Sequence, residues 1–190
     1  MVAPKRLPPW HEDFRLSDGR QMLVRPIRAE DAAPIRGAWP LFEPETLRRR
    51  ALGGGAEPAA EALLRLSTPD PRNAFVLVAA EPLPPGEAVI GALAAAALQP
   101  GRQDARFHLL VSRFVHGQGL SRHLLLRLVK WARGRGVASL AGEVPADNAP
   151  LRELARSLGF HEQGDGEAAG LVRVVLDLAA PVAATAQARG

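Results

Sequence analysis

The stretch VHGQGLSRHLLLR, residues 115–127, places two glycines between an apolar, strand-like segment and a helical pattern. The first turn of a helix carries unpaired backbone N–H groups and the positive end of the helix dipole. Glycines at that point let the backbone approach an anion closely and adopt conformations that are closed to other residues. The stretch therefore predicts a cradle for a phosphate group. The alternative is a tight strand-to-helix turn without a ligand, because short glycine patterns often occur by chance.

The same glycine pattern excludes two common nucleotide-binding loops. A Walker A loop requires Gly-Lys-Ser or Gly-Lys-Thr after the glycines, and this sequence continues with Leu-Ser-Arg. The dinucleotide fingerprint requires a third glycine, which is absent, and a preceding strand that belongs to a β-α-β unit. The helix after the glycines has a regular apolar stripe, which predicts that one of its faces is buried. The members of this stripe are Leu124, Leu125, Leu128, Val129 and Ala132.

The elements that must position this loop combine hairpins with one crossover. Apolar runs predict strands at 20–27, 74–80, 88–98, 105–111, 137–144 and 171–178. Amphipathic stretches predict helices at 29–42, 45–52, 56–66, about 120–133 and about 149–158. The early strands follow one another in hairpins, and helices join only the later ones. We therefore expect an α+β fold around one mixed sheet rather than a doubly wound parallel fold.

Most of the chain is expected to form a single domain. A length of 190 residues is sufficient for one domain with a substantial core. Residues 1–19 are rich in proline and polar side chains, so we expect a loosely attached arm. Residues 179–190 are expected to form a disordered tail. The predicted domain spans residues 20–178, and no internal repeat divides it.

The composition limits the classes of function. A chain without cysteine forms no disulfides and uses no thiolate chemistry. Its start, MVAPKRLPPWHEDF, lacks the apolar region of a secretory signal, and no apolar run is long enough to span a bilayer. These features predict a cytoplasmic protein without a membrane partner. The net charge of +4 would suit an anionic ligand, but a general compositional bias toward Arg, Ala, Gly and Pro is the favoured explanation. Aromatic residues make up only 5% of the chain and the basic residues are interleaved with acidic ones, which disfavours a nucleic-acid partner.

The runs LLVSRFVHGQGLSRHLL (109–125) and LARSLGF (154–160) resemble the GNAT superfamily of acyl-coenzyme A N-acetyltransferases. LVRPIRAEDAAPIR resembles the first strand and helix of that family, and VASLAGEVPADNAPLRELARSLGF resembles its fifth strand and the helix that follows. In detail the sequence looks most like the acetyltransferase domain of bacterial protein-lysine acetyltransferases. The resemblance implies a mixed, mostly antiparallel central sheet with a splayed strand pair and flanking helices. It also implies acetyl-CoA as the co-substrate, an amine as the acceptor, and no metal.

The resemblance assigns cofactor-binding residues as well. The backbone of Val111 is implied to bind the pantetheine arm and to polarise the thioester. The family's pyrophosphate loop corresponds to His116-Gly117-Gln118-Gly119-Leu120-Ser121, and the backbone N–H groups from Gly117 to Arg122 are implied to hold the pyrophosphate. Asn148, before the 149–158 helix, is implied to contact the cofactor, and an ordinary N-cap is an equally good and compatible interpretation. Leu110 and Leu151 are implied to pack along the cofactor, with ordinary core packing as the alternative.

The catalytic residues depart from the family's pattern. Acetyl transfer to an amine needs a neutral nucleophile, so a base must remove the ammonium proton. The position of the family's base, a glutamate on the fourth strand, is Arg106 in this chain, which removes the carboxylate and adds a cation that repels an ammonium group. The tyrosine that many relatives use as an acid is also absent, and Ala155 lies near its place. The residues that match the family's cofactor-binding motif are therefore present, whereas the positions of its catalytic base and acid hold other residues.

Three residues are candidates for the missing base. His108 shares a strand face with position 106, and an imidazole exchanges protons near neutral pH, although a structural strand histidine is the alternative. Glu143 is expected on the neighbouring strand, where it either faces the cleft or pairs with an arginine on the sheet surface. Asp104 begins the strand of His108 and is the weakest candidate. His116 is expected to support the loop and not to act in catalysis. A mechanism that relies only on the proximity of an already neutral amine also stays open.

Three classes of function follow, and we rank an N-acetyltransferase first. The second is a non-catalytic acyl-CoA-binding regulatory module of the same fold, which Arg106 and the absent tyrosine would explain. The third is a nucleic-acid binder, suggested by the excess of basic residues and by Arg48-Arg49-Arg50.

The acceptor stays open between a protein lysine, an N-terminal amine and a small molecule such as a polyamine. Residues of about 30–73 and a hairpin at 161–170 are expected to line the acceptor side. Glu43, Glu45 and Glu57 lie in the first of these segments and would attract a cationic amine. The oligomeric state is also open, with a homodimer among the possibilities.

Overall fold

The computed structural model describes residues 8–50, 57–166 and 168–179. The strands are β1 (Glu12–Arg15), β2 (Gln21–Pro26), β3 (Phe42–Glu43), β4 (Ala74–Ala80), β5 (Ile90–Leu98), β6 (Asp104–Ser112), β7 (Ser139–Pro145), β8 (His161–Asp165) and β9 (Leu171–Asp177). The α-helices are α1 (Ala32–Ala38), α2 (Glu45–Arg50), α3 (Ala60–Ser67), α4 (Leu120–Gly134) and α5 (Ala149–Ser157). Short 3-10 helices are η1 (Ala29–Asp31), η2 (Trp39–Leu41) and η4 (Arg113–Val115).

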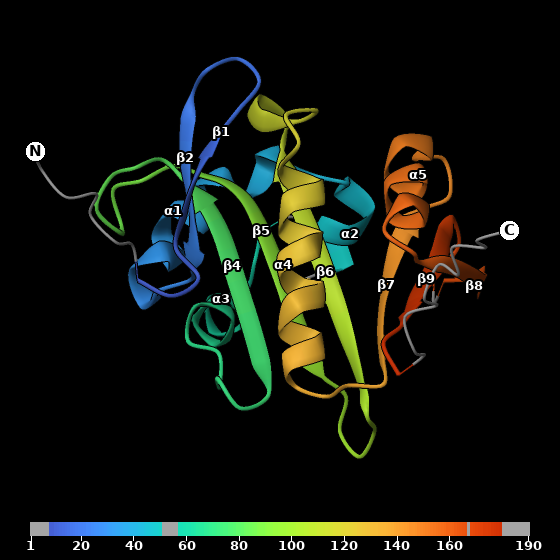
Figure 1. Ribbon diagram of the computed structural model, residues 1–190. Helices are drawn as coiled ribbons and strands as arrows, with labels where there is room; N and C mark the ends of the chain where they lie inside the picture. The colour runs from blue at the N-terminus through green and yellow to red at the C-terminus, as the bar shows by residue number, and fades with distance from the viewer. Residues whose placement is uncertain (1–7, 51–56, 167, 180–190) are drawn as a thin grey trace, which may run out of the picture.

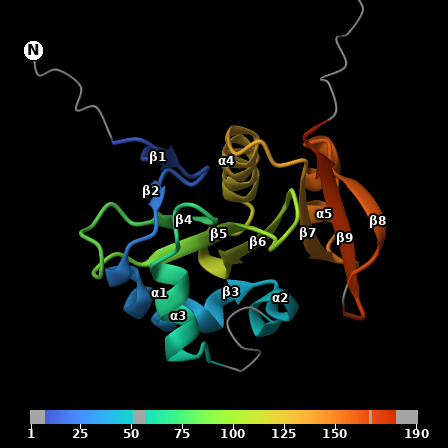
Figure 2. The same ribbon diagram turned by 90° about the horizontal axis from the view of Figure 1, so that it is seen from below.

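The strands form one sheet in the order β1-β2-β4-β5-β6-β7-β9-β8, and β3 pairs with β6 outside this path. Neighbouring strands run antiparallel, except for β6 and β7, which are parallel. Helix α4 lies on one face of the sheet, and α1, α2 and α3 lie on the other (Figures 1 and 2). The predicted α+β fold with a mixed, mostly antiparallel sheet is confirmed.

Alternation along β6 divides its side chains between two hydrophobic cores. Phe107, Leu109 and Val111 belong to the core that includes the buried face of α4. Leu110 belongs to the second core, together with Ile35 of α1. Successive side chains of a strand point to opposite faces of the sheet. This alternation decides which residues of β6 can reach a site on the α4 side.

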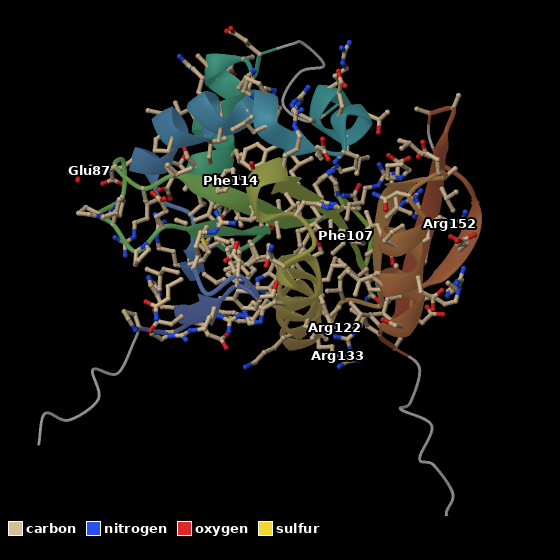
Figure 3. The ribbon with its side chains drawn as sticks, turned by 90° about the horizontal axis from the view of Figure 1, so that it is seen from above. Glu87, Phe107, Phe114, Arg122, Arg133 and Arg152 are labelled. Atoms are coloured by element: carbon tan, nitrogen blue, oxygen red, sulfur yellow. The ribbon has the colours of Figure 1, made fainter. Side chains whose placement is uncertain are left out.

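Strands β6 and β7 pair only at their first residues. Their register runs from Asp104↔Ser139 to Arg106↔Ala141, and the strands then diverge, as the resemblance implied. Phe107 fills the start of the opening (Figure 3). Its ring lies 5.5 Å from that of Phe160, measured between centroids, and a Cβ added to Gly142 would come within 2.3 Å of it. Glycine is therefore required at position 142, because any side chain there would occupy the space of the aromatic ring.

A buried ion pair fixes the turn from β2 to α1. Arg25 Nη1 lies 2.7 Å from Asp31 Oδ2, and Arg25 Nη2 lies 2.8 Å from Asp31 Oδ1, with both side chains buried. The backbone N–H of Arg28 also donates to Asp31 Oδ2, at 2.9 Å. Removal of either charged partner would leave an uncompensated buried charge, which is strongly destabilising. The predicted single helix at 29–42 is divided into η1, α1 and η2, and Pro40 stands at the start of η2, where a missing N–H costs least.

The second half of the predicted N-terminal arm differs from the expectation. Glu12–Arg15 form the edge strand β1, which pairs with β2 in the register Glu12↔Val24 to Arg15↔Gln21. Just before it, the ring of Trp10 packs on Phe75 at 4.8 Å and lies 5.1 Å below the guanidinium of Arg127 in α4. The strand escaped prediction because it is short, charged and only half-buried, as edge strands commonly are.

Several predictions fall outside the described residues. They concern the first residues of the arm, most of the tail at 179–190, and parts of the predicted helices at 45–52 and 56–66. None of the helices within the described ranges is both long and apolar enough to cross a membrane.

Candidate functional site

A cavity of about 280 Å³ lies at the end of β6, between the start of α4 and the start of α5. We call it the loop cavity, because residues 116–122 form one of its borders. The end of β6, the start of α5 and the strand β3 form the others. Its lining residues are Glu43, Pro44, Leu109, Val111, Val115, His116, Gly117, Gln118, Gly119, Leu120, Ser121, Arg122, Asn148, Pro150, Leu151 and Leu154.

The loop that lines this cavity includes the N-terminus of α4 and its first backbone N–H groups. Gly117 and Gly119 have φ angles of 71° and 86°, in the left-handed region that favours glycine. Gly119 is the N-cap of α4, so the first N–H groups of the helix have no acceptor within it. The first bond of the helical ladder runs from the N–H of His123 to the carbonyl of Gly119, at 3.2 Å. Together with the helix dipole, these groups form a site for an anion.

The α5 border is held by side chains at both ends of the helix. Asn148 is its N-cap, and its Oδ1 accepts a hydrogen bond from the N–H of Leu151 at 3.1 Å. The predicted N-cap role is therefore confirmed, and the same residue lines the loop cavity. Near the other end, Ser157 Oγ accepts a bond of 3.1 Å from Arg122 Nη1 in the first turn of α4 (Figure 3). This contact links the two helices that border the cavity.

The hairpin of β1 and β2 supports the loop from outside. Ser17 Oγ donates a hydrogen bond to Oε1 of Gln118, the residue between the two loop glycines. Arg20 Nη2 donates to the carbonyl of Phe114 at 2.6 Å, just before the loop. The ring of Phe14 lies 3.7 Å from the position that a Cβ on Gly119 would occupy. The N-terminal segment therefore fixes the backbone that forms the anion site.

His123 connects the same hairpin to α4. Its ring lies 4.9 Å from that of Phe14, and its Nε2 lies 3.3 Å from Glu12 Oε2, which also accepts from Arg127 at 2.7 Å. Burial lowers the pKa of His123 below its ordinary value of 6.5. The charge of Glu12 acts in the opposite direction, and that of Arg127 lowers the pKa further. The fold therefore favours the neutral form of this histidine.

Strand β3, which was not predicted as a strand, forms a further border of the cavity. It pairs with β6 in the register Phe42↔Ser112 and Glu43↔Val111. Val111 thus has strand neighbours on both sides, since it also pairs with Ala92 of β5. In the described part of the chain, β6 lacks a neighbouring strand on its β7 side only over residues 107–110. The implied role of the Val111 backbone stays a prediction, while its side chain lines the cavity.

The predicted cofactor residues meet at the loop cavity, with the exception of Leu110. This prediction is wrong in its geometry, because the side chain of Leu110 points to the opposite face and is buried in the core around α1. Leu109 takes its place, and the alternation of the strand from Val111 would have identified it. Glu43, which the sequence assigned to the acceptor side, also lines this cavity. Pro44 and the strand β3 were not predicted, because a two-residue strand has no recognisable sequence pattern.

The predicted bases lie elsewhere. His108 and Glu143 line a separate recess of about 20 Å³ between β6 and β7, together with Arg106 and Arg173. Neither of them lines the loop cavity. Asp104 lies where β6 and β7 are paired, and its Oδ1 accepts a hydrogen bond of 2.9 Å from Ser139. Glu143 lies on the strand next to that of His108, as predicted, and the catalytic role of both residues stays a prediction.

The loop cavity fits a cofactor that carries a pyrophosphate. The N–H groups at the start of α4 need acceptors, and a Cβ built on Gly117 meets no heavy atom within 4 Å, so the space before the loop is open. The lining residues Leu109, Leu151 and Leu154 provide an apolar wall for the rest of such a molecule. Among the residues that the structure describes, no group of three or more His, Asp or Glu side chains is placed to hold a metal ion.

Comparison with known proteins agrees with this geometry. A family model described as the acetyltransferase (GNAT) family matches residues 41–160, more than half of the chain.

Three solved structures have the same fold. The GNAT domain of S. lividans PAT is 22% identical, with a TM-score of 0.72, over 90% of this chain and 99% of that domain. YncA from Salmonella typhimurium, solved with its cofactor acetyl-CoA, is 23% identical, with a TM-score of 0.64, over 86% of this chain and 99% of YncA. The ribosomal-protein-S18-alanine N-acetyltransferase from Escherichia coli is 21% identical, with a TM-score of 0.58, over 83% of this chain and 94% of that enzyme. From the extent of the family match, and with a fold that agrees, this chain belongs to the GNAT family of acetyltransferases.

Proposed function

We propose that this protein transfers the acetyl group of acetyl-CoA to an amine, with the pyrophosphate of the cofactor held at the loop cavity. The observation that carries the proposal is the series of N–H groups from Gly117 to Arg122, at the start of α4 and beside an apolar wall. Membership of an acetyltransferase family favours an enzyme over the non-catalytic binding module and over a nucleic-acid binder.

Each border of the cavity has a part in holding the cofactor. The backbone of the loop binds the pyrophosphate, with His116 and Arg122 as the nearby basic side chains. The side chains of Val111 and Leu151 contact the arm that leads to the acyl group, and Asn148 lies at the border where α5 begins. Bound acetyl-CoA supplies an activated acetyl thioester.

The acceptor is proposed to be a primary amine, with a protein lysine as one candidate. The amine must lose a proton before it can attack a carbonyl carbon, so a base has to lie within hydrogen-bond reach of it. His108 and Glu143 are the bases that the sequence suggests. A cytoplasmic location and a homodimeric assembly, both compatible with the sequence, belong to the same proposal.

The first test is binding. Calorimetric titration with acetyl-CoA should give a single site, and ligand at about one hundred times its Kd should stabilise the fold by about 2.7 kcal/mol. A protein that neither binds acetyl-CoA nor melts at a higher temperature in its presence would contradict the proposal.

The second test is turnover. Acetyl-CoA is offered with an amine panel of three members: Nα-acetyl-lysine amide, a peptide with a free N-terminus, and spermidine. Release of the CoA thiol is measured between about pH 6 and pH 9, where the base and the amine change protonation. Mass spectrometry of the acceptors then identifies the acetylated amine. Binding without any thiol release across this panel would favour the non-catalytic module.

A further inference from the structure

Glu43 is a carboxylate at the loop cavity, and it lies in the segment that the sequence assigned to the acceptor side. Among the described residues that line the cavity, it is the one acidic side chain, and the ionisable side chains His116 and Arg122 are basic. A carboxylate weakens the binding of an anion to the same cavity. Its presence there is therefore better explained by a cationic group that enters the cavity as well.

The position of Glu43 follows from its strand. Residues directly opposite each other in an antiparallel pair point to the same face of the sheet. Glu43 is the register partner of Val111, and Val111 and Leu109 line the cavity from the α4 side. The carboxylate of Glu43 therefore lies beside the end of β6, on the face where the cofactor is proposed to bind.

Arginines hold this carboxylate and its strand in place. Arg113 Nε lies 3.4 Å from Glu43 Oε1, and Arg113 Nη2 donates to the carbonyl of Pro40 at 3.1 Å. Arg48 Nη1 donates to the carbonyl of Phe42 at 3.3 Å. A carboxylate accepts about four hydrogen bonds, so the contact with Arg113 leaves capacity for a substrate amine. The side chain is 43% exposed, so it can also exchange protons with water.

The two bases suggested by the sequence are less favourably placed. His108 lies at an even position of β6, so its side chain points away from the face of Leu109 and Val111. Glu143 lines the same recess as His108 and does not line the loop cavity. A general base must be within about 3 Å of the proton that it removes, or one water away. Geometry therefore favours the carboxylate that is already at the cavity.

We propose that Glu43 is the catalytic base and the binding group for the acceptor amine. This inference rests on the proposed function, because it needs an acetyl thioester in the loop cavity. The carboxylate accepts one proton from the ammonium group of the acceptor. The neutral nitrogen then forms a bond to the carbonyl carbon as the carbon–sulfur bond breaks. The second proton of the nitrogen passes to the departing thiolate, and Glu43 releases its proton to water.

The test compares Glu43→Gln with a matched variant, Glu61→Gln. Glu61 on α3 is also exposed, pairs with Arg65 at 2.6 Å and does not line the cavity. With the amine panel, Glu43→Gln should lower kcat by about one hundredfold or more, with partial recovery at high pH, where more of the amine is neutral. Its Kd for acetyl-CoA, measured by calorimetry, should be unchanged or tighter, because an anionic neighbour is gone. Glu61→Gln should match the wild type in both measurements.

Three results would overturn this assignment. One is a Glu43→Gln variant that keeps its turnover. Another is a loss of acetyl-CoA affinity that parallels the loss of turnover, which would indicate a structural role. The third is a loss of turnover in His108→Asn or Glu143→Gln while Glu43→Gln stays active. A wild-type protein that binds no acetyl-CoA, or turns over no amine, would instead contradict the proposed function and remove the basis of the inference.

Discussion

The loop cavity and the recess between β6 and β7 use different parts of the chain to make a site. The loop cavity relies on backbone groups: two glycines with positive φ angles and the N–H groups that open α4. The recess relies on side chains, those of Arg106, His108, Glu143 and Arg173. A backbone site depends on conformation and tolerates many changes of sequence around its glycines, whereas a side-chain site changes its chemistry with a single substitution.

This difference explains why the family's binding motif persists while its catalytic motif does not. By the resemblance, Arg106 stands at the position of the family's carboxylate, and a guanidinium stays protonated at any relevant pH, so that position cannot supply a base. The loop retains its glycines and its place at the end of β6. If the reaction uses a base, that base must be another residue, and Glu43 on β3 lies at the cavity.

The largest expected effect concerns the side chain that separates these two regions. Phe107 is 4% exposed and packs on Phe160 in the opening of the strands. Phe107→Ala should lower the free energy of unfolding by about 3–5 kcal/mol, because it leaves a cavity where β6 and β7 diverge. Urea unfolding measures the loss, and Phe107→Leu should lose clearly less. A loss below about 1 kcal/mol would show that the packing of Phe107 contributes little to the stability of the opening between β6 and β7.

The second prediction tests whether the backbone of the loop binds acetyl-CoA. Gly119→Asp adds a carboxylate in front of the anion site and should raise the Kd for acetyl-CoA by about one hundredfold, or 2.7 kcal/mol. Gly101→Asp is the matched control. Gly101 also has a positive φ, of 68°, but lies in the turn between β5 and β6, away from the cavity. Equal affinities for the two variants in calorimetry would refute the loop as the binding site.

A smaller effect tests whether the N-terminal hairpin supports the loop. Ser17→Ala removes the hydrogen bond to Gln118 and should weaken acetyl-CoA binding about two- to fivefold, which corresponds to the loss of one ordinary hydrogen bond. Turnover at saturating acetyl-CoA should not change. Ser139→Ala removes a bond to Asp104 at the closed end of β6 and should leave the affinity for acetyl-CoA as it is. If both variants bind equally well, the hairpin has no part in shaping the loop.

The smallest effect is a pH dependence of stability where His123 of α4 packs against the same hairpin. Burial lowers the pKa of His123 in the folded protein below its ordinary 6.5, so the unfolded chain binds a proton first as the pH falls. Its contribution to the free energy of unfolding is therefore complete above about pH 6.5 and declines as the pH falls through the folded pKa. Urea unfolding at about pH 7.5 and pH 5.5 should show a smaller decline for His123→Gln than for the wild type. His161→Gln, at an exposed histidine on β8, should behave like the wild type.

The parts of the site that depend on local chain order could be predicted from the sequence. Gly119 before an apolar periodic segment indicates a helix start, and Asn148 before the next helix indicates an N-cap. Both assignments are correct, because they depend on neighbours within a few residues.

The remaining parts depend on contacts between distant residues. Leu110 was assigned to the cofactor because the resemblance identified a segment and not a strand face. The pairing of Glu43 with Val111 joins residues far apart in the sequence, and β3 is too short to have a periodicity of its own. The strand β1 is likewise stabilised by its contacts with β2 and α4, which no local composition reveals.

The way in which β6 changes partners also limits where a second chain could add a strand to β6. A strand edge with unpaired N–H and C=O groups is a template on which another chain can add a strand. Here β7 covers Asp104–Arg106 and β3 covers Val111 and Ser112, so the open edge is limited to residues 107–110. Typical strands have about five to six residues, longer than this gap, and β7 and β3 close both of its ends. A narrow, flexible ligand arm can therefore use the edge, while a second polypeptide has too little length on which to pair.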